Sequence, residues 1–429
     1  MTATEQLIEV INEGHNVFLS GVGGCGKSYL LKQLYEYYSN PQHYRKVVLT
    51  STTGISAYNI GGVTLHSFFK VVLPSTPPLD IMEFINKMIH RIRRNRVVLQ
   101  RYLTTQLVLI DEISMCGSSM MDVLNYVCKQ IRCNSKPFGG IQMILSGDMM
   151  QLPPVKDEYP FESASWEELN LKMFRLTKAW RFTHQSWVDL LHRARLGQLT
   201  TDDVHVLQSR VNCRADSAPV YLASKNDVVS GINTTGLASL SGPTTVYLAS
   251  DFEIPFEEES IQPSKQVALP PEITSQFLAD SALYLKEGAK VMLLANLNAS
   301  EGLANGTRGT VTKLTPHVVT VAFPTTTVDI SPYEFKIELG SSNKKYCRVA
   351  IPLKLAYATS IHKSQGLTLD QVEMDIGSDV FMDGQSYVAL SRCKQLDGLF
   401  INKLDVSKIK PNYKALKFEQ EFLKRCTEL

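Results

Sequence analysis

Residues 21–28 read Gly21-Val22-Gly23-Gly24-Cys25-Gly26-Lys27-Ser28, and the apolar run Val17-Phe18-Leu19 precedes them. Glycines at this spacing before Lys and Ser are typical of a phosphate-binding loop between a strand and a helix. Small residues let successive backbone N–H groups close around a polyphosphate, while Lys27 supplies charge and Ser28 supplies an oxygen for Mg²⁺. The apolar run before the loop and the helix-like segment after it argue against a chance glycine-rich turn. The loop therefore predicts a nucleoside triphosphate ligand.

Composition limits the classes of protein to which this chain can belong. Its 429 residues, 44% of them hydrophobic, suffice for two or three domains with separate cores. No apolar stretch reaches the roughly 18 uncharged residues of a membrane span, and residues 1–6 lack a basic and then apolar leader. The eight cysteines show no zinc-ligand spacing. We therefore expect an intracellular protein in a reducing compartment, with nucleus, mitochondrion, bacterial cytoplasm and virus-infected cell not distinguished.

The charge balance says little about partners. Lys and Arg total 44 against 42 Asp and Glu, which gives a net charge of +2. A polyanion would therefore have to be held by a local groove and not by the overall charge.

Short apolar runs alternate with amphipathic segments in the first third of the chain. Four such runs, each followed by a polar or glycine-bearing loop, cover residues 17–19, 46–49, 107–110 and 142–145. This alternation is typical of an α/β fold with a parallel sheet and crossover helices. Ligands of such sheets bind at the carboxyl ends of the strands, so we expect a site built from several loops.

The chain changes character after about Leu176. A helical segment, 187–195, is ended by Gly197. Residues 306–351 are rich in β-branched residues and turns, which indicates a small antiparallel barrel inserted into a second domain. Segment 252–271, with acidic residues and four prolines, is expected to be an exposed loop.

Two further motifs follow predicted strands. Asp111 and Glu112 come directly after the third run, where one carboxylate can hold Mg²⁺ and the other can orient water. We assign Asp111 to the metal and Glu112 to the general base; the alternative is a solvated turn. After the fourth run, Gln151 stands beside the rigid pair Pro153-Pro154, although an ordinary proline-terminated loop would look the same.

These motifs together make a resemblance specific. The run Asp111-Glu112-Ile113-Ser114-Met115, followed by Gly147-Asp148-Met149-Met150-Gln151-Leu152-Pro153-Pro154, resembles superfamily-one DNA helicases of the Pif (petite integration frequency) and RecD-like branch. The similarity spans nearly the whole chain in the family's order. Further similar blocks lie at 52–57, 62–68, 161–166, 302–309, 359–369 and 387–392.

The resemblance implies a domain organisation. The fold would be α/β, with two RecA-like parallel-sheet domains, a small inserted wedge region and an SH3-like β-barrel insertion. The first domain would cover 1–178 with the wedge at about 69–104. The second would cover 179–304 and 352–429, with the barrel at 305–351.

The resemblance also implies roles for residues around the nucleotide. Arg181 and Arg392 look like the paired arginines that stabilise charge on the transferring phosphoryl group, brought in when the second domain closes on the first. One departure is Phe182, where relatives usually have Gln after the first arginine, and a surface salt bridge is the alternative for Arg181. The implied catalytic set is Lys27, Asp111, Glu112, Gln151, Arg181 and Arg392. Mg²⁺ would lie on Ser28 and Asp111, and ATP would contact Gln6 at the adenine edge and Gly21, Gly23, Gly24, Cys25, Gly26, Lys27, Ser28 and Gly366.

DNA contacts are expected from polar and aromatic side chains along a groove, because unpaired strands are held through phosphates and by stacking of bases on rings. His66 and His362 lie in Ser- or Thr-bearing segments that suit phosphate binding, although a lone histidine is often structural. The basic run 90–96 could add strand or duplex contacts or be a solvated helix face. The candidate DNA-binding residues are Thr53, His66, Phe68, Pro154, Asn296, His362 and Lys363.

The function implied is an ATP-dependent DNA helicase that moves 5′-to-3′ on single-stranded DNA in replication, repair, recombination or telomere-type maintenance. Expected partners of this monomeric motor are single-stranded and 5′-tailed or forked duplex DNA, with G-quadruplexes and RNA–DNA hybrids as further candidates and no membrane. The alternative is a DNA-stimulated translocase or motor subunit of a repair complex that does not unwind by itself. A nucleotide kinase on the same loop is a third class, but it would not need the blocks that contain His362 and Arg392.

Overall fold

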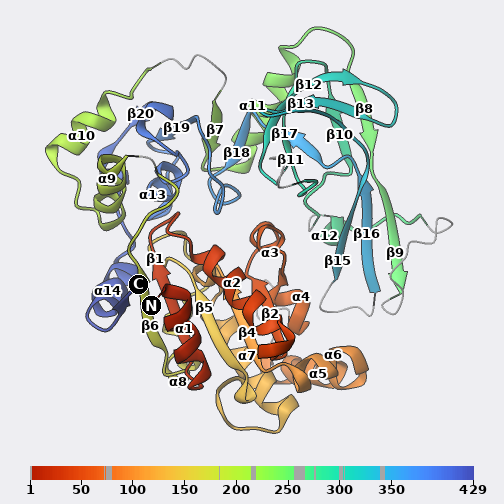
Figure 1. The fold of residues 1–429 in the computed structure, drawn as a ribbon. Helices are drawn as coiled ribbons and strands as arrows, with labels where there is room; N and C mark the ends of the chain where they lie inside the picture. Colours follow the sequence, from red (N-terminus) through yellow and green to blue (C-terminus); the bar gives the residue numbers. More distant parts are fainter. Residues whose placement is uncertain are drawn as a thin grey trace. The chain divides into compact units, whose positions relative to one another are not determined.

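The computed structural model describes residues 2–71, 73, 80–182, 184–213, 219–255, 266–274, 277–298, 303, 305–338 and 344–429. The chain folds into two compact units (Figure 1). The first comprises Met1–Ser209, Val380–Leu396 and Asp405–Leu429, and the second comprises Arg210–Asp379 and Asp397–Leu404. Parts of four predicted segments lie outside the described residues: 72 and 74–79 of the wedge, 256–265 of the expected loop, 302 and 304 of one motif block, and 339–343 of the barrel.

The first unit is built on a seven-stranded parallel sheet in the order β21-β6-β1-β5-β4-β2-β3. The four apolar runs predicted to be parallel strands form β1, β2, β4 and β5, so that prediction is confirmed. Strands β1, β4 and β5 are buried along their whole length, which is why their sequences are continuously apolar. The strands are β1 Val17–Gly21, β2 Val47–Ser51, β3 Val63–Thr64, β4 Leu107–Asp111, β5 Gln142–Ser146, β6 Lys172–Leu176 and β21 Thr427–Glu428.

Helices cover the sheet of the first unit, and two apolar clusters form its core. The helix predicted at 187–195 is present as α9 and ends at Gly197 in the left-handed conformation, as expected. The helices are α1 Ala3–Asn12, α2 Lys27–Ser39, α3 Gly54–Ile60, α4 Leu65–Phe69, α5 Ile81–Arg94, α6 Arg96–Thr104, α7 Ser118–Arg132, α8 Ala164–Glu168, α9 Gln185–Leu196, α10 Thr201–Gln208, α13 Gln385–Leu390 and α14 Tyr413–Leu423. Short 3₁₀ turns are η1 Pro41–His43, η2 Ile113–Met115, η3 Pro137–Gly140, η4 Pro160–Glu162 and η7 Val406–Lys408, and η6 Leu396–Gly398 lies where the units meet in sequence.

The last helix, α14, packs into the core of the first unit. The ring of Phe18 in β1 makes edge-to-face contacts with Phe418 and Phe422 of α14 and with Trp166, at centroid separations of 5.9, 5.5 and 5.1 Å. Aromatic pairs of this kind add to the free energy of burial. Residues more than 380 positions apart in the sequence therefore share one core. The compact units do not follow the predicted domain boundaries, so those boundaries remain a prediction.

The second unit has a parallel sheet in the order β18-β7-β19-β20. Antiparallel sheets accompany it, in the orders β14-β13-β12-β11-β17, β15-β16-β9 and β10-β8. Its strands are β7 Val220–Ala223, β8 Thr245–Leu248, β9 Ser250–Pro255, β10 Ala282–Leu285, β11 Lys290–Leu293, β12 Arg308–Leu314, β13 Val319–Ala322, β14 Thr327–Ile330, β15 Tyr333–Glu338, β16 Lys344–Ala350, β17 Leu353–Leu355, β18 Ala358–Ser360, β19 Val372–Ile376 and β20 Leu399–Leu404, and its helices are α11 Asn226–Ala238 and α12 Pro271–Thr274.

The α/β class with two parallel sheets and antiparallel insertions is thus confirmed. The expected loop at 252–271 is partly wrong, because residues 252–255 belong to β9 and pair with β16. Pairing with a distant strand overrides the proline and acidic signals there. The antiparallel sheet of the insertion also uses β11 and β17, which flank the predicted range 305–351.

Among the helices that the structure describes, none combines the length and the apolarity that a crossing of a lipid bilayer requires.

Replacing Phe422 by Ala should lower the free energy of unfolding of the first unit by about 3–5 kcal/mol, because it empties a buried aromatic position in the core. The three tryptophans of the chain all lie in this unit, so fluorescence-monitored denaturation reports on it directly. Tyr413, 78% exposed on the same helix, is the matched control, and its Ala variant should stay within about 0.5 kcal/mol of wild type. Equal effects of the two substitutions would contradict the packing of α14 described above.

Candidate functional site

The chemistry-bearing loops of the first unit meet at one edge of its sheet. Strands β1, β5 and β4 are neighbours and run parallel, so their carboxyl ends lie side by side. Gly21 ends β1, Asp111 ends β4, and Asp148 follows β5 after one turn residue. The sheet order therefore brings three predicted motifs, separated by up to 127 residues in the sequence, to one place.

The predicted phosphate loop connects β1 to α2, whose first residue is Lys27. The Lys27 ammonium is only 8% exposed and donates to the loop's own carbonyl oxygens of Gly21, at 2.6 Å, and Val22, at 3.1 Å. Backbone N–H groups of Trp180 and Arg181 donate to the Gly24 carbonyl oxygen at 2.9 and 3.2 Å. The segment that carries the first predicted arginine thus lies directly on the loop.

Gly24 shows why the loop needs glycine. Its φ of +83° is rarely adopted by other residues, and a Cβ there would collide with the Cβ of Arg181. The close approach of Arg181 to the loop therefore depends on the missing side chain.

Ser28 and Asp111 form the oxygen pair that the sequence predicts for a metal. The Ser28 hydroxyl donates to Asp111 Oδ2 at 2.6 Å. Burial raises the pKa of the Asp111 carboxyl, opposed by the hydrogen bond from Ser28 and by the charge of Lys27. A hydroxyl and a carboxylate are ligands that Mg²⁺ accepts, and Mg²⁺ usually completes its shell with water and substrate phosphates.

Glu112 has an unusual backbone conformation. Its φ is +53°, in the left-handed region, a conformation that costs a non-glycine residue about 1–3 kcal/mol. Its N–H donates to Asp111 Oδ1 at 3.0 Å, and the Thr52 hydroxyl donates to its carbonyl oxygen at 2.8 Å. The side chains on either side of this turn differ in burial, because Asp111 is buried and Glu112 is half-buried.

Arg392 and Gln151 lie beside Gly23, and Arg181 lies beside Gly24. A Cβ at Gly23 would lie 3.5 Å from Arg392 Nη2 and 3.8 Å from Gln151 Nε2. Burial, and next the charge of Arg181, lowers the pKa of Arg392 to about 9. Burial likewise lowers the pKa of Arg181, and its Nη1 is buried without a hydrogen-bond partner among the described residues. Two buried guanidinium groups repel each other here, and a polyanion would relieve that repulsion.

The structure groups Arg392 with the loop. The prediction brought Arg392 in from a separate second domain, whereas segment Val380–Leu396, which carries it, belongs to the same compact unit as the loop. Its guanidinium also donates to the Val388 carbonyl oxygen at 2.9 Å and the Ser391 hydroxyl at 2.7 Å.

Sequence reasoning missed a buried polar cluster behind these residues. Arg195 of α9 pairs with Asp148 and with Glu419 of α14, each at 2.7 Å, and the Tyr387 hydroxyl donates to Asp148 at 3.3 Å. A signal for Arg195 exists in the sequence: it continues the buried positions Trp187 and Leu191 at four-residue spacing on α9. An arginine on an apolar helix face requires buried carboxylate partners.

Trp180 was also missed. It is 69% exposed beside the loop, where a Cβ at Gly26 would lie 3.5 Å from its ring, and Lys178 Nζ lies 3.9 Å from the ring centroid. An exposed indole beside a phosphate loop offers a flat surface to a base. The sequence signal was its position directly before Arg181.

Gln6 occupies α1, which a hydrogen bond from Thr4 to Gln33 ties to α2. Its side chain is half-buried.

The DNA-binding candidates of the first unit differ in their accessibility. Thr53 caps α3 by accepting from the Ser56 N–H at 3.2 Å, and His66 is exposed, although it lies on helix α4 and not in a loop as expected. Pro154, a candidate DNA-binding residue, is buried in this structure; the exposed apolar side chain of that turn is Val155, at 64%.

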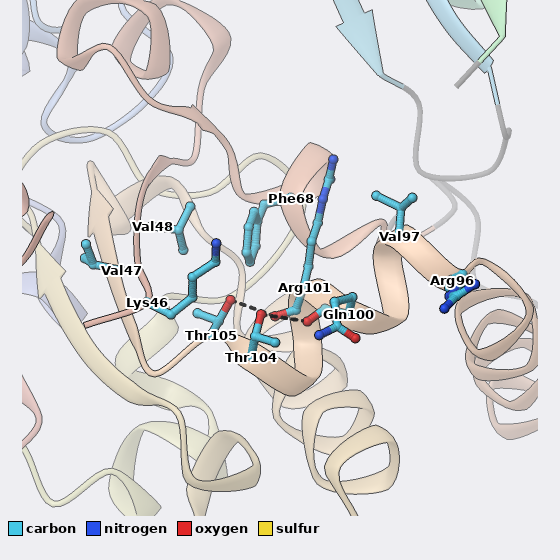
Figure 2. A pocket seen from close by; sticks show the side chains of 10 residues that line it. All are labelled: Lys46, Val47, Val48, Phe68, Arg96, Val97, Gln100, Arg101, Thr104 and Thr105. Atoms are coloured by element: carbon cyan, nitrogen blue, oxygen red, sulfur yellow. Dashed lines mark hydrogen bonds between the residues drawn. The ribbon is translucent and has the colours of Figure 1, made fainter. Parts of the chain in front are cut away.

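Phe68 lines a pocket of about 810 Å³ between β2, α4 and α6. Figure 2 shows its ring between Val48 and Arg101, and the Arg101 guanidinium lies 5.8 Å from the ring centroid. Lys46 and Arg96 are the other cations of the lining. One ring face is therefore occupied by an arginine, a contact that sequence spacing could not reveal.

The basic run 90–96 covers the end of α5 and the start of α6. Ile92 of this run is buried in the core, whereas Arg91, Arg94 and Arg96 are exposed. The exposure of these arginines is compatible with both predictions, contacts with DNA and a solvated helix face.

The remaining candidates belong to the second unit. Asn296 is exposed, and its Oδ1 accepts from the Asn305 N–H at 2.7 Å. His362, Lys363 and Gly366 lie in the turns that follow β18, at the carboxyl end of a parallel strand. Burial lowers the pKa of His362, so its imidazole is neutral at pH 7 and would meet a phosphate through a hydrogen bond.

Family models match two parts of the chain. The model described as PIF1-like helicase matches residues 2–202, and the model described as DNA helicase Pif1, 2B domain, matches residues 269–314.

Individual proteins match nearly the whole chain. The ATP-dependent DNA helicase PIF1 of Danio rerio is 34% identical over 97% of this chain. The chain spans 63% of the length of that protein, which is less than two thirds. The crystal structure of Pif1 helicase from Candida albicans superimposes with a TM-score of 0.79 at 30% identity, covering 98% of this chain and 99% of the other. A Bacteroides Pif1 helicase in complex with ADP-AlF3 and single-stranded DNA gives a TM-score of 0.70 at 26% identity, with coverages of 99% and 97%.

Substituting Arg181 by Met should leave the melting temperature of the nucleotide-free protein unchanged or raise it, because a buried, partly unsatisfied cation is removed. The same substitution should lower kcat for ATP hydrolysis by about 10²–10³-fold. Melting curves with and without a non-hydrolysable triphosphate, together with steady-state ATPase assays, test both effects. A variant that melts well below wild type and keeps its ATPase would show that Arg181 is a structural ion-pair residue.

Proposed function

The chain belongs to the PIF1-like helicase family, and from that premise we propose that it is an ATP-dependent DNA helicase that moves 5′-to-3′ on single-stranded DNA and unwinds duplex. One observation carries the proposal: Lys27, the Ser28 and Asp111 pair, and two buried arginines converge on a single glycine loop. Such a concentration of donors and positive charge suits a triphosphate undergoing phosphoryl transfer.

Residues in and around the phosphate loop would each bind a different part of the nucleotide. Lys27 would exchange its carbonyl contacts in the loop for phosphate oxygens, since its ammonium already points among the loop atoms. Ser28 and Asp111 would hold Mg²⁺, which supplies charge neutralisation to the phosphates when bound. Gln6 would contact the adenine edge, and the exposed ring of Trp180 would stack against the base.

The remaining groups act on the reacting phosphoryl group. Glu112, aimed by its left-handed backbone, would take the proton of the attacking water. Gln151 beside Gly23 would sense the γ-phosphate, and Arg181 and Arg392 would stabilise the charge that spreads over it. Hydrolysis would then depend on the position of segment 380–396, which carries Arg392 and continues into the strands of the second unit through Leu399.

DNA would be held by groups on both units. Thr53, His66 and Phe68 on the first unit, and Asn296, His362 and Lys363 on the second, combine hydroxyl, imidazole, amide, ammonium and aromatic groups, as an unpaired strand requires. At Phe68, the DNA would contact the ring together with the Arg101 guanidinium that lies over it. The single-stranded DNA in the Bacteroides relative's complex supports this ligand class.

The finer organisation is part of the same proposal. Helices α5 and α6 would form the wedge region within 69–104, and the antiparallel strands within 305–351 would close into an SH3-like barrel between the halves of a second RecA-like domain. The motor would act as a monomer inside the cell on single-stranded and 5′-tailed or forked DNA. The names of the relatives support the helicase class, and G-quadruplexes and RNA–DNA hybrids are further substrates to test.

The direct test is strand displacement on matched forked, 5′-tailed and 3′-tailed duplexes, with ATP hydrolysis followed in parallel. We expect displacement of the forked and 5′-tailed substrates. Displacement from the 3′-tailed substrate alone would refute the polarity, and hydrolysis stimulated by single-stranded DNA without any displacement would favour a translocase.

In the same assay, Lys27→Ala should abolish displacement and lower hydrolysis by at least about 10²-fold, because it removes the cation from the phosphate site. Lys32→Ala, one turn further along α2 and half-buried, is the matched control and should behave like wild type. Unwinding by the Lys27 variant at the wild-type rate would overturn the assignment of the loop.

A further inference from the structure

A continuous path of buried polar contacts runs from the phosphate loop to the last helix of the chain. The Gly23 N–H donates to the Tyr387 hydroxyl at 3.3 Å, and that hydroxyl donates to Asp148 Oδ2 at 3.3 Å. Arg195 donates to Asp148 from Nη2 at 2.7 Å and from Nε at 3.1 Å. From its Nη1, Arg195 also donates to Glu419 on α14 at 2.7 Å. All four side chains of the path are buried.

Asp148 is the centre of this path. Besides Arg195 and Tyr387, it accepts from the Met150 N–H at 3.1 Å and from Gln151 Nε2 at 3.3 Å. Burial is the largest single influence and opposes ionisation of this carboxyl, but the charges of Arg195 and Lys27 and the hydrogen bonds from Arg195 and Met150 together hold the pKa of Asp148 below its usual value. A carboxylate held by a two-point contact with arginine has one preferred orientation. Asp148 therefore fixes both the loop around Gln151 and the tyrosine.

The Tyr387 hydroxyl accepts a hydrogen bond from a backbone N–H group of the phosphate loop that a nucleotide would also use. Backbone N–H groups of a phosphate loop point at the bound phosphates, and Gly23 is next to Arg392 and Gln151. In the structure, the Tyr387 hydroxyl oxygen takes the Gly23 N–H in place of a phosphate oxygen. An entering triphosphate would compete with it for this donor.

We propose that Arg195 and Tyr387 are positioning residues of the nucleotide site: Arg195 orients Asp148, and Tyr387 connects Asp148 to Gly23 in the phosphate loop. Glu419 anchors the opposite end of Arg195, so helix α14 sets the geometry of the site from outside it. This inference rests on the proposed ATPase function. It adds that the carboxyl-terminal helix controls turnover without touching the nucleotide.

The energetics favour such a role over simple stabilisation. A buried ion pair contributes little net stability compared with apolar residues of the same shape, because desolvation offsets the attraction. Its contacts are nevertheless directional, and the two-point contact of Arg195 with Asp148 holds both side chains in one arrangement. Phe18, Phe418 and Phe422 already fix α14 to the core through apolar contacts. The Glu419, Arg195 and Asp148 contacts therefore add orientation at the site more than attachment of the helix.

The test uses two substitutions that keep side-chain shape, Tyr387→Phe and Glu419→Gln, in the full chain. Tyr387→Phe should lower kcat for ATP hydrolysis by about tenfold to a hundredfold, since small displacements of reacting groups have effects of this size. Its KM for ATP and its affinity for a fluorescent ADP analogue should stay within about threefold of wild type or tighten, because a competitor for the Gly23 N–H is lost. Glu419→Gln should lower kcat in the same direction by a smaller factor.

The double variant gives the sharper readout. If the two residues act through one path, the combined loss in kcat should be clearly smaller than the product of the single losses. Tyr102→Phe is the matched control: it also removes a buried hydroxyl, one that donates to the Phe69 carbonyl oxygen at 2.6 Å, and it should leave kcat unchanged.

Two results would overturn the proposal. One is a kcat for Tyr387→Phe equal to that of Tyr102→Phe. The other is a parallel loss of melting temperature and ADP-analogue binding in Tyr387→Phe beyond that of Tyr102→Phe, which would mark a purely structural residue. Failure of the proposed function is distinguishable, because wild-type protein would then bind or hydrolyse no ATP.

Discussion

The candidate nucleotide site of the first unit depends on the concentration of positive charge around one loop. Lys27 and Arg392 are buried and Arg181 is half-buried, all within reach of Gly21 to Ser28, and desolvation lowers the pKa values of the two arginines. Like charges in a medium of low dielectric constant repel strongly, so this arrangement carries an electrostatic cost in the nucleotide-free protein. A triphosphate is a ligand of opposite charge whose binding would offset that cost. Binding of a triphosphate would therefore stabilise the first unit.

The surrounding scaffold makes such a site possible. Parallel pairing of β1, β5 and β4 brings three loops together, and Gly24 lets Arg181 come close to the phosphate loop. Behind the loop, Arg195 forms ion pairs with both Asp148 and Glu419, whereas the front of the site brings the like charges of Arg181 and Arg392 close together. A buried layer of ion pairs thus supports the groups that would contact the nucleotide, so that different residues hold the site and would perform its chemistry.

Much of this architecture could be predicted from the sequence, because local signals specify it. The strands β1, β2, β4 and β5 follow from apolar runs, and the placement of Lys27, Ser28 and Asp111 follows from a parallel sheet. Long-range packing could not be predicted. Glu419 meets Arg195 across 224 positions, β9 pairs with β16 although its sequence resembles a loop, and Pro154 is buried in a turn that exposes Val155 instead. These positions are determined by tertiary partners that no local pattern announces.

The central claim is that the charged loop binds ATP and that its hydrolysis is coupled to a strand of DNA. The most direct measurement is the steady-state rate of ATP hydrolysis as single-stranded DNA is titrated against a fixed concentration of the chain and saturating ATP with Mg²⁺. The account predicts slow hydrolysis without DNA and a rise to a plateau at saturating DNA. A rate that is the same with and without DNA would contradict this expectation, because ATP hydrolysis at the loop would then be independent of DNA.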